Sequence, residues 1–246
     1  MEPLVKEPVG IRAERALATR RRMLAAAKDL FGRHGYAATT VEQIAAEAGV
    51  AVQTVYYTFR SKGLLLCELI EVTAAGSEEV MPVMERTWAI EMLSASSAQR
   101  VLALAVEHGT AIYGRVAALW PAVAAASAAD ADVGTYWNSV SAARRDAQRR
   151  IVTRVVELGA LRPGLDPERA TDLVVVLLGH DVYRNLVIEA GWSVASFRAW
   201  LFVTLVEQLL DRVQLDTPAA DKLSFDHRLN AAQSEDPDAD AIPAHD

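Results

Sequence analysis

The chain has 246 residues, and its 25 Lys and Arg stand against 32 Asp and Glu, which gives a formal net charge of −7. This acidic balance argues against a general affinity for nucleic acids. The single cysteine, Cys67, excludes an intrachain disulfide, and its apolar neighbours favour a buried thiol over a redox sensor. Because we find neither a signal-peptide layout nor a fully apolar span of about 20 residues, we expect a soluble, cytoplasmic protein.

The charge is unevenly distributed. Residues 1–66 contain ten Lys or Arg and six Asp or Glu, and the remainder contains fifteen against twenty-six. A basic head on an acidic body would orient the molecule on a polyanion. An arginine run marks the start of this head: Arg12, Arg15, Arg20, Arg21 and Arg22. It is either a solvated, frayed terminus or an arm that follows phosphates or enters a minor groove.

The first helix is predicted from about Thr19 to His34, after a flexible basic arm over residues 1–18. One apolar stripe supports the helix, and Gly35 ends it: Met23, Leu24, Ala27, Leu30 and Phe31. A second helix begins near Val41, because Thr40 and Gln43 have the spacing of a capping box. Gly49 then permits a sharp turn, and a short helix follows over residues 52–59. Helices this short need partners, so we expect the three to share one small core.

These residues resemble the TetR family of one-component transcriptional regulators. The resemblance is carried by Phe31 to Leu66, FGRHGYAATTVEQIAAEAGVAVQTVYYTFRSKGLLL, and above all by T-V-Y-Y-x-F followed by S-K. It implies a helix-turn-helix DNA-binding domain over residues 19–66. It also implies the roles of several side chains: Thr40 and Tyr56 at phosphates, Gln53, Thr54 and Tyr57 at or near base edges, and Lys62 at a phosphate. The arginine run, interpreted as an arm on the DNA, adds Arg20 and Arg22 as further candidate DNA contacts.

Two positions depart from the family pattern. Ala51 stands where Ser or Thr often caps the third helix, and Gly63 stands where Glu or Ala is common. We expect the first to cost about 1 kcal/mol of local stability and the second to weaken the next helix. The alternative to a DNA contact is that the Tyr-Tyr pair on this short helix only packs at the edge of a core.

The rest of the chain predicts an all-α fold of about nine helices in total. A helical effector-binding and dimerisation domain is expected over residues 67–215, and a disordered acidic tail over residues 216–246. The expected helices lie at about 62–77, 81–93, 98–116, 119–132, 134–158, 167–190 and 193–213. Asp166 and Pro167 have the pattern of a helix start.

The last two helices, at about 167–190 and 193–213, are more apolar than one buried stripe requires. They form either the core of one subunit or the surface of a homodimer. The resemblance implies the homodimer, with a four-helix bundle whose twofold axis sets the two heads about one DNA turn apart. The predicted partner is therefore an approximately palindromic double-stranded operator.

Aromatic and polar residues inside the body are candidates for binding a small apolar or amphipathic effector. They are Trp88, Met92, His108, Tyr113, Trp120, Trp137, His180 and Arg184. Each also has an ordinary interpretation as core. We expect no cofactor, because no His, Cys and carboxylate set has metal-site spacing. The favoured function is a ligand-released repressor. The alternatives are a ligand-independent regulator or interaction module and, remotely, an all-α enzyme, for which no nucleophile or phosphate-loop motif is present.

Overall fold

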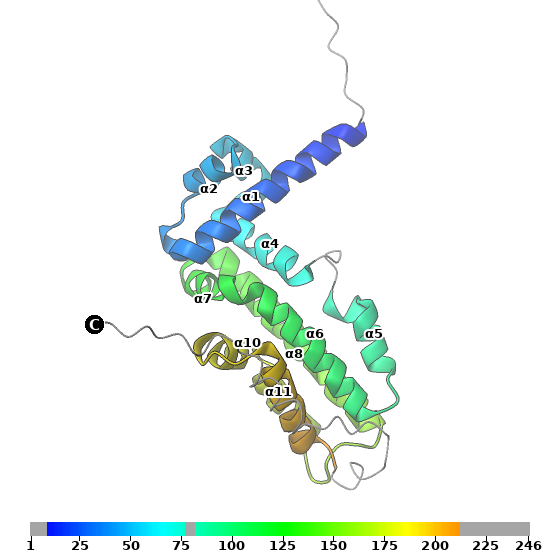
Figure 1. The fold of residues 1–246 in the computed structure, drawn as a ribbon. Coiled ribbons are helices and arrows are strands. Elements are labelled where there is room, and N and C mark those ends of the chain that lie inside the picture. Colours follow the sequence, from blue (N-terminus) through cyan, green and yellow to red (C-terminus); the bar gives the residue numbers. More distant parts are fainter. Residues whose placement is uncertain (1–8, 77–81, 212–246) are drawn as a thin grey trace, which may run out of the picture. The chain divides into compact units, whose positions relative to one another are not determined.

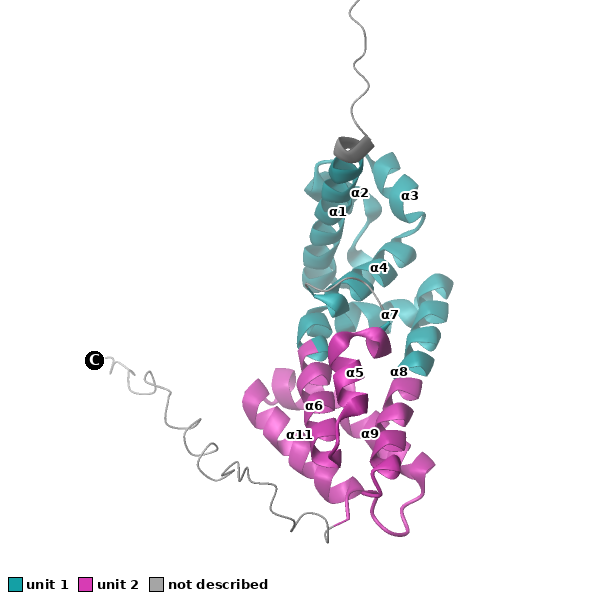
Figure 2. Ribbon diagram, turned by 90° about the vertical axis from the view of Figure 1, so that its right-hand side faces the viewer, with its two compact units in different colours: residues 1–82, 112–144 teal, residues 83–111, 145–246 magenta. Residues whose placement is uncertain are grey.

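The computed structural model describes residues 9–76 and 82–211. The expected all-α fold is confirmed: these residues contain no strand beyond an isolated antiparallel bridge between Leu161 and Leu210. The chain divides into two compact units (Figure 2). Unit 1 comprises residues 1–82 and 112–144, and unit 2 comprises residues 83–111 and 145–246. The predicted acidic tail lies outside the described residues.

Unit 1 begins with α1 (Val9–Ala38), α2 (Val41–Ala48), α3 (Val52–Phe59) and α4 (Lys62–Ala75) (Figure 1). It continues with the end of α6 (Ala98–Val116), η2 (Ala117–Leu119), α7 (Trp120–Ala129) and the first half of α8 (Ala131–Glu157). The first helix starts at Val9, so the boundary predicted near Thr19 is wrong. Ten residues of the predicted flexible arm are helical, and residues 1–8 lie outside the described part.

One hydrophobic core runs through unit 1. The predicted stripe of α1 packs with Ile44 of α2 and Val55 and Phe59 of α3, as expected for three helices that share a core. The same core also takes in α7 and the start of α8, through Val123 and Val133. The helix-turn-helix therefore has no core of its own. Residues far apart in sequence complete it, a feature that the local periodicity did not indicate.

Unit 2 contains η1 (Val83–Glu85), α5 (Thr87–Ser94), most of α6 and the second half of α8. It ends with α9 (Pro167–Leu177), α10 (His180–Tyr183), the π-helical turn η3 (Arg184–Glu189) and α11 (Val194–Leu209). Its core includes side chains without measurable exposure on five helices: Met92, Leu102, Val155, Val174, Leu201, Leu205 and Leu209.

The single helix predicted for 167–190 is wrong, because the helix breaks at Leu178 and Gly179. Gly179 has an extended conformation (φ −108°, ψ 151°). A Cβ built on it would lie 2.7 Å from the carbonyl oxygen of Val176. The backbone at the break thus favours a residue without a side chain. Helical conformation resumes after it in α10 and the π-helical turn.

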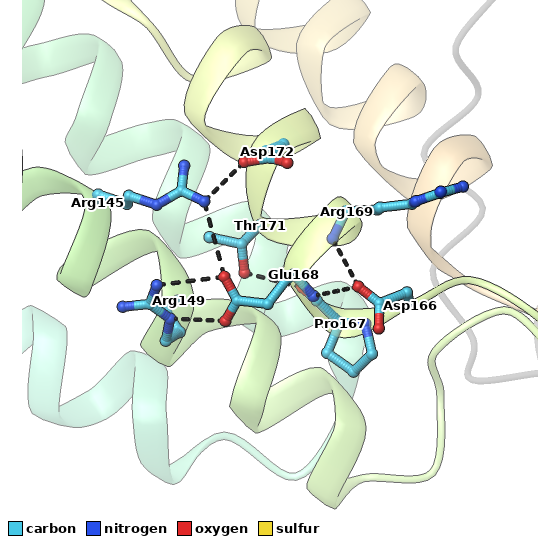
Figure 3. A network of polar contacts seen from close by, with 8 residues as sticks. All are labelled: Arg145, Arg149, Asp166, Pro167, Glu168, Arg169, Thr171 and Asp172. Carbon is cyan, nitrogen blue, oxygen red and sulfur yellow. Dashed lines mark hydrogen bonds and ion pairs between the residues drawn. The ribbon is translucent and has the colours of Figure 1, made fainter.

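The start of α9 follows the prediction. Asp166 caps the helix, accepting the N–H groups of Glu168 at 3.0 Å and Arg169 at 3.1 Å, and Pro167 occupies the first turn (Figure 3). Arg149 of α8 holds the carboxylate of Glu168 with two hydrogen bonds of 2.9 and 3.2 Å. This pairing lowers the pKa of Glu168. Because both partners are exposed, the pair orients α9 more than it stabilises it.

Among the described helices, the stretch Ala98–Ala129 is long and apolar enough to cross a membrane, with a mean hydropathy of 1.2. It is not one straight helix, because η2 and Pro121 divide it into α6 and α7. Its buried residues include Leu102 in unit 2 and Leu119 in unit 1. We interpret it as two helices that each contribute buried side chains to the fold.

Candidate nucleic-acid interface

The turn between α2 and α3 is built as the sequence predicts. Thr40 caps α2: its Oγ1 accepts the backbone N–H of Gln43 at 3.3 Å, and Oε1 of Gln43 accepts the N–H of Thr40 at 2.8 Å. Gly49 ends α2 in the left-handed region, with φ 64° and ψ 43°. These two devices fix the direction in which α3 leaves the turn.

The short helix α3 separates a core face from an open face. Val55 and Phe59 are buried, whereas Tyr57 is 91% exposed and Tyr56 is 44% exposed. Gln53 is also exposed, and Thr54 is half-buried. Leaving a large aromatic side chain in water forfeits a burial free energy of about 2 kcal/mol. The α3 surface therefore has the character of an exposed contact face, and the alternative that the Tyr-Tyr pair only packs on the core does not apply to Tyr57.

The basic side chains are placed differently from one another. Arg20 forms a two-pronged ion pair with Glu68 of α4, in which its Nε lies 2.5 Å from Oε1, and its guanidinium lies 5.1 Å from the ring centre of Phe59. Arg20 therefore ties α1 to α4. Arg22 is exposed beside the turn, since a Cβ built on Gly49 would lie 3.8 Å from its Nη1.

Lys62 is held inside unit 1. Its ammonium donates hydrogen bonds of 2.9 Å to the carbonyl oxygens of Tyr36 and Thr39, and it lies 4.1 Å from the ring centre of Tyr36. These carbonyls end α1 and precede α2, so Lys62 joins α4 to both. A phosphate contact from Lys62 would have to replace these bonds. Its role at a phosphate stays a prediction, and the geometry favours a structural role.

Sequence reasoning missed two further groups at this interface. Arg60 ends α3 as the one described non-glycine residue with a positive φ, at 66°, and it is exposed. Its position beside the open face makes it a further candidate for a phosphate. Asp130, from the junction of α7 and α8, accepts the hydroxyl of Tyr36 at 2.5 Å. No local motif could have indicated that pair, because 94 residues separate its members.

The expectation for Cys67 is consistent with its surroundings. The thiol is buried, and burial raises its pKa to about 11, with the charges of Asp130 and Glu71 adding to the shift. The described residues include no group of His, Cys, Asp and Glu able to hold a metal ion. Cys67 therefore has the environment of an inert core side chain.

The candidate effector residues come together only in part. In unit 2, Trp88 and His108 stack at 4.4 Å with their planes 8° apart, and Met92 is buried. In unit 1, Trp120 and Trp137 meet edge to face at 4.7 Å. Tyr113 belongs to unit 1, and His180 and Arg184 belong to unit 2. His180 pairs with Asp181, and Arg184 pairs with Glu189.

One groove in unit 1, of about 330 Å³, lies outside this set. Its lining combines an apolar floor with three cations, none of which is a predicted effector residue. The lining residues are Arg21, Leu24, Ala25 and Lys28 of α1, Leu69, Val72 and Thr73 of α4, Gly76, and Arg115 of α6. Arg115 also closes α4 by donating a 2.6 Å hydrogen bond to the carbonyl oxygen of Ala74.

Comparisons with known proteins agree with this geometry. Residues 23–69 match the family model of bacterial regulatory proteins, tetR family. No curated protein matches the chain. Two solved structures with a similar fold are efflux-pump repressors. NalD of Pseudomonas aeruginosa, the secondary repressor of the MexAB-OprM pump, is 19% identical over 80% of this chain and 99% of its own, with a TM-score of 0.61.

SmeT, the repressor of the Stenotrophomonas maltophilia pump SmeDEF, is 20% identical over 80% of this chain and 93% of its own, with a TM-score of 0.58. FadR of Bacillus subtilis, solved in complex with stearoyl-CoA, is 18% identical over 76% of this chain and 98% of its own, with a TM-score of 0.59. The TM-scores show that the fold is shared, and at identities this low the similarity shows the fold alone.

Proposed function

We propose that the chain is a homodimeric transcriptional repressor, because residues 23–69 match the family model of bacterial regulatory proteins, tetR family. It binds an approximately palindromic operator in the cytoplasm and is released by a small apolar or amphipathic ligand. The observation that carries the proposal is the open face of α3, where an almost fully exposed Tyr57 stands beside Gln53 on a helix whose other face is buried.

By their chemistry, some side chains of this face suit base edges and others suit phosphates. Gln53 carries both a donor and an acceptor, which suits hydrogen bonds to a base edge. The hydroxyls of Thr40 and Tyr56 suit phosphate oxygens, and Arg22 and Arg60 supply positive charge beside them. Thr54 and Tyr57 complete the proposed base-reading surface. Arg20 and Lys62 are assigned a structural role in the head, because Arg20 is paired with Glu68 and Lys62 donates to backbone carbonyls.

The operator test uses two matched substitutions on α3. Purified protein should shift its own upstream intergenic DNA, and Gln53→Ala should relax the sequence preference at one operator position by about 1–3 kcal/mol. Tyr56→Phe keeps the ring and removes only the hydroxyl, so it should weaken all operators alike. Binding by quantitative gel shift to a panel of single-base operator variants separates the two effects. The division of roles fails if both substitutions lower every affinity by one common factor.

The proposed dimer surface is the apolar face of α9, η3 and α11. Val174, Phe197, Leu201, Leu205 and Leu209 of this region are already buried within one chain. Val176 and Ile188 remain 62% and 57% exposed, and they give the region unburied apolar surface. An isologous pairing of two copies would cover such a face and set two heads on one duplex.

Light scattering with detection of molar mass tests the dimer. The double substitution Val176→Asp and Ile188→Asp should give a folded monomer that binds the full operator at least tenfold more weakly, because one head contacts only one half-site. Ile90→Asp is the matched control, since Ile90 of α5 is 58% exposed and lies outside the proposed surface. A monomeric wild-type chain, or a dimer that survives the double substitution, contradicts this assignment.

The ligand part of the proposal rests on the aromatic pairs, chiefly Trp88 with His108 in unit 2. Flat, weakly polar compounds suit such stacked rings. A thermal-shift screen of metabolites and drugs should find a compound that raises Tm and also weakens operator binding. If compounds stabilise the protein without changing operator affinity, or if none binds, the ligand-independent regulator is the better description.

A further inference from the structure

Asp130, between α7 and α8, uses its two carboxylate oxygens for different parts of unit 1. Oδ1 accepts the backbone N–H groups of Asp132 at 3.0 Å and Val133 at 3.3 Å, which caps the start of α8. Oδ2 accepts the hydroxyl of Tyr36, at the end of α1, at 2.5 Å. A single side chain therefore bonds to the helix-turn-helix and to the first turn of α8 at the same time.

The start of α4 completes this arrangement. A Cβ built on Gly63 would lie 2.7 and 2.8 Å from the two carboxylate oxygens of Asp130, so the carboxylate would have to move if residue 63 had a side chain. Lys62 bonds to the carbonyl of Tyr36, and Ser61 donates to Oδ2 of Asp132 at 3.1 Å. The presence of glycine at position 63 is thus explained by the carboxylate of Asp130, which comes from a distant part of the sequence. The glycine also lowers the helix propensity of the first turn of α4.

The charges agree with this geometry. The hydrogen bond from Tyr36 lowers the pKa of Asp130, with the backbone N–H groups and the charge of Lys62 adding to the effect. Burial, followed by the bond to Asp130, raises the pKa of Tyr36. The pair is therefore an ionised carboxylate with a neutral phenol, the charge-assisted combination that gives strong and directional hydrogen bonds.

We propose that Asp130 is a positioning residue that holds the helix-turn-helix in one orientation on the start of α8, and that it thereby sets the separation of the two reading helices in the dimer. Apolar contacts alone are not directional, whereas this hydrogen bond is. Because α8 continues unbroken from Ala131 to Glu157, a ligand that displaces α8 would act on the head through the same junction. The proposal rests on the function proposed above and specifies how that function is regulated.

Tyr36→Phe tests the junction with little other change. The ring keeps its place against Phe31, with centroids 5.7 Å apart, and Asp130 can still cap α8. The probes are the operator that the wild-type chain binds, versions with one or two base pairs added between the half-sites, and an isolated half-site. We expect unchanged half-site affinity but a preference for the native spacing that falls about tenfold, the worth of one hydrogen bond to a charged group. An unchanged spacing preference overturns the proposal.

Gly63→Ala provides a test in which two interpretations predict opposite results. If Asp130 has only a structural role, the displaced carboxylate should lower Tm and leave the spacing preference intact. If Asp130 positions the head, the new methyl group displaces its carboxylate, and the variant should lose spacing preference as Tyr36→Phe does. Gly32→Ala in α1 is the matched control, because a Cβ there meets nothing within 4 Å. It should leave the preference unchanged.

The proposed function and the proposed junction can be disproved separately. A wild-type chain that binds no operator overturns both the proposed function and the junction. Normal operator binding with full spacing preference in Tyr36→Phe and Gly63→Ala overturns only the junction. A lower Tm in Tyr36→Phe without a change in spacing preference assigns Asp130 a purely structural role and counts against the proposal.

Discussion

At the scale of single residues, two departures from the family pattern have different physical meanings. Ala51 is a simple loss: it lies at the N-cap of α3 in extended conformation and has no side-chain oxygen to accept a backbone N–H. Gly63 is matched to its surroundings, because a Cβ there would displace the carboxylate of Asp130 from its present position. Both residues weaken a helix by propensity alone, yet only one can be replaced without disturbing a neighbour.

Cys67 gives a prediction at this scale. With a pKa of about 11, only about one thiol in a thousand is ionised at pH 8, and the side chain is 6% exposed. We expect the native protein to react with a thiol reagent such as DTNB at least a hundredfold more slowly than the guanidinium-unfolded chain. The unfolded chain is the control, with one thiol per chain. Rapid labelling of the native protein would show that α4 opens readily or that this environment is wrongly assigned.

At the scale of elements, the helix-turn-helix depends on its caps because α2 and α3 have eight residues each. Helices of two turns do not persist alone in water, so their ends and their packing decide whether they form. Thr40 and Gln43 satisfy the start of α2 reciprocally, and Gly49 ends it. The start of α3 lacks such a group, and the proposed reading helix is therefore the less well capped of the two.

Restoring that cap should stabilise the head. In Ala51→Ser, the new hydroxyl can accept the N–H of Gln53 or Thr54, which we expect to raise the free energy of unfolding by about 1 kcal/mol. Ala46→Ser is the matched control, because Ala46 is exposed inside α2, where serine lowers helix stability by about half a kcal/mol. Urea unfolding followed by circular dichroism measures both variants. Equal destabilisation by the two serines would contradict the assigned N-cap.

At the scale of the whole molecule, the charge of the head opposes that of the rest. Residues 1–66 carry a small excess of Lys and Arg within a chain whose net charge is −7. Phosphate contacts by the head and repulsion of the acidic remainder both favour binding with one end of the molecule. Salt should weaken these contacts by screening them and by removing the gain from counterion release.

Operator binding should therefore fall steeply with salt, by at least a hundredfold between 50 and 200 mM, as several phosphate contacts require. Arg22→Ala should lower the slope of log K against log salt concentration by about 1. Tyr56→Phe is the control, since it removes a neutral hydroxyl and should reduce affinity while the slope stays the same. Fluorescence anisotropy across a salt series measures both. A slope that Arg22→Ala leaves unchanged would place Arg22 away from the phosphates.

Local sequence patterns were enough to predict the features that depend on neighbours along the chain. The capping box at Thr40, the left-handed Gly49, the buried face of α3 and the Asp166 cap all follow from spacing, because a helix repeats every 3.6 residues and its ends need defined partners. The helix start at Val9 and the break at Gly179 escaped the same reasoning. In the first case the apolar stripe did not extend to the true boundary. In the second, the backbone at Gly179 leaves no room for a Cβ beside the Val176 carbonyl, a contact that spacing alone does not indicate.

Which side chains are available for contact with DNA follows from packing between distant segments. Arg20 and Lys62 suit a DNA contact by type and position, yet each is engaged with groups of its own chain. The junction of Tyr36, Gly63 and Asp130 joins segments up to 94 residues apart. No local pattern carries such information, because hydrogen bonds and excluded volume between distant segments exist only once the chain has folded.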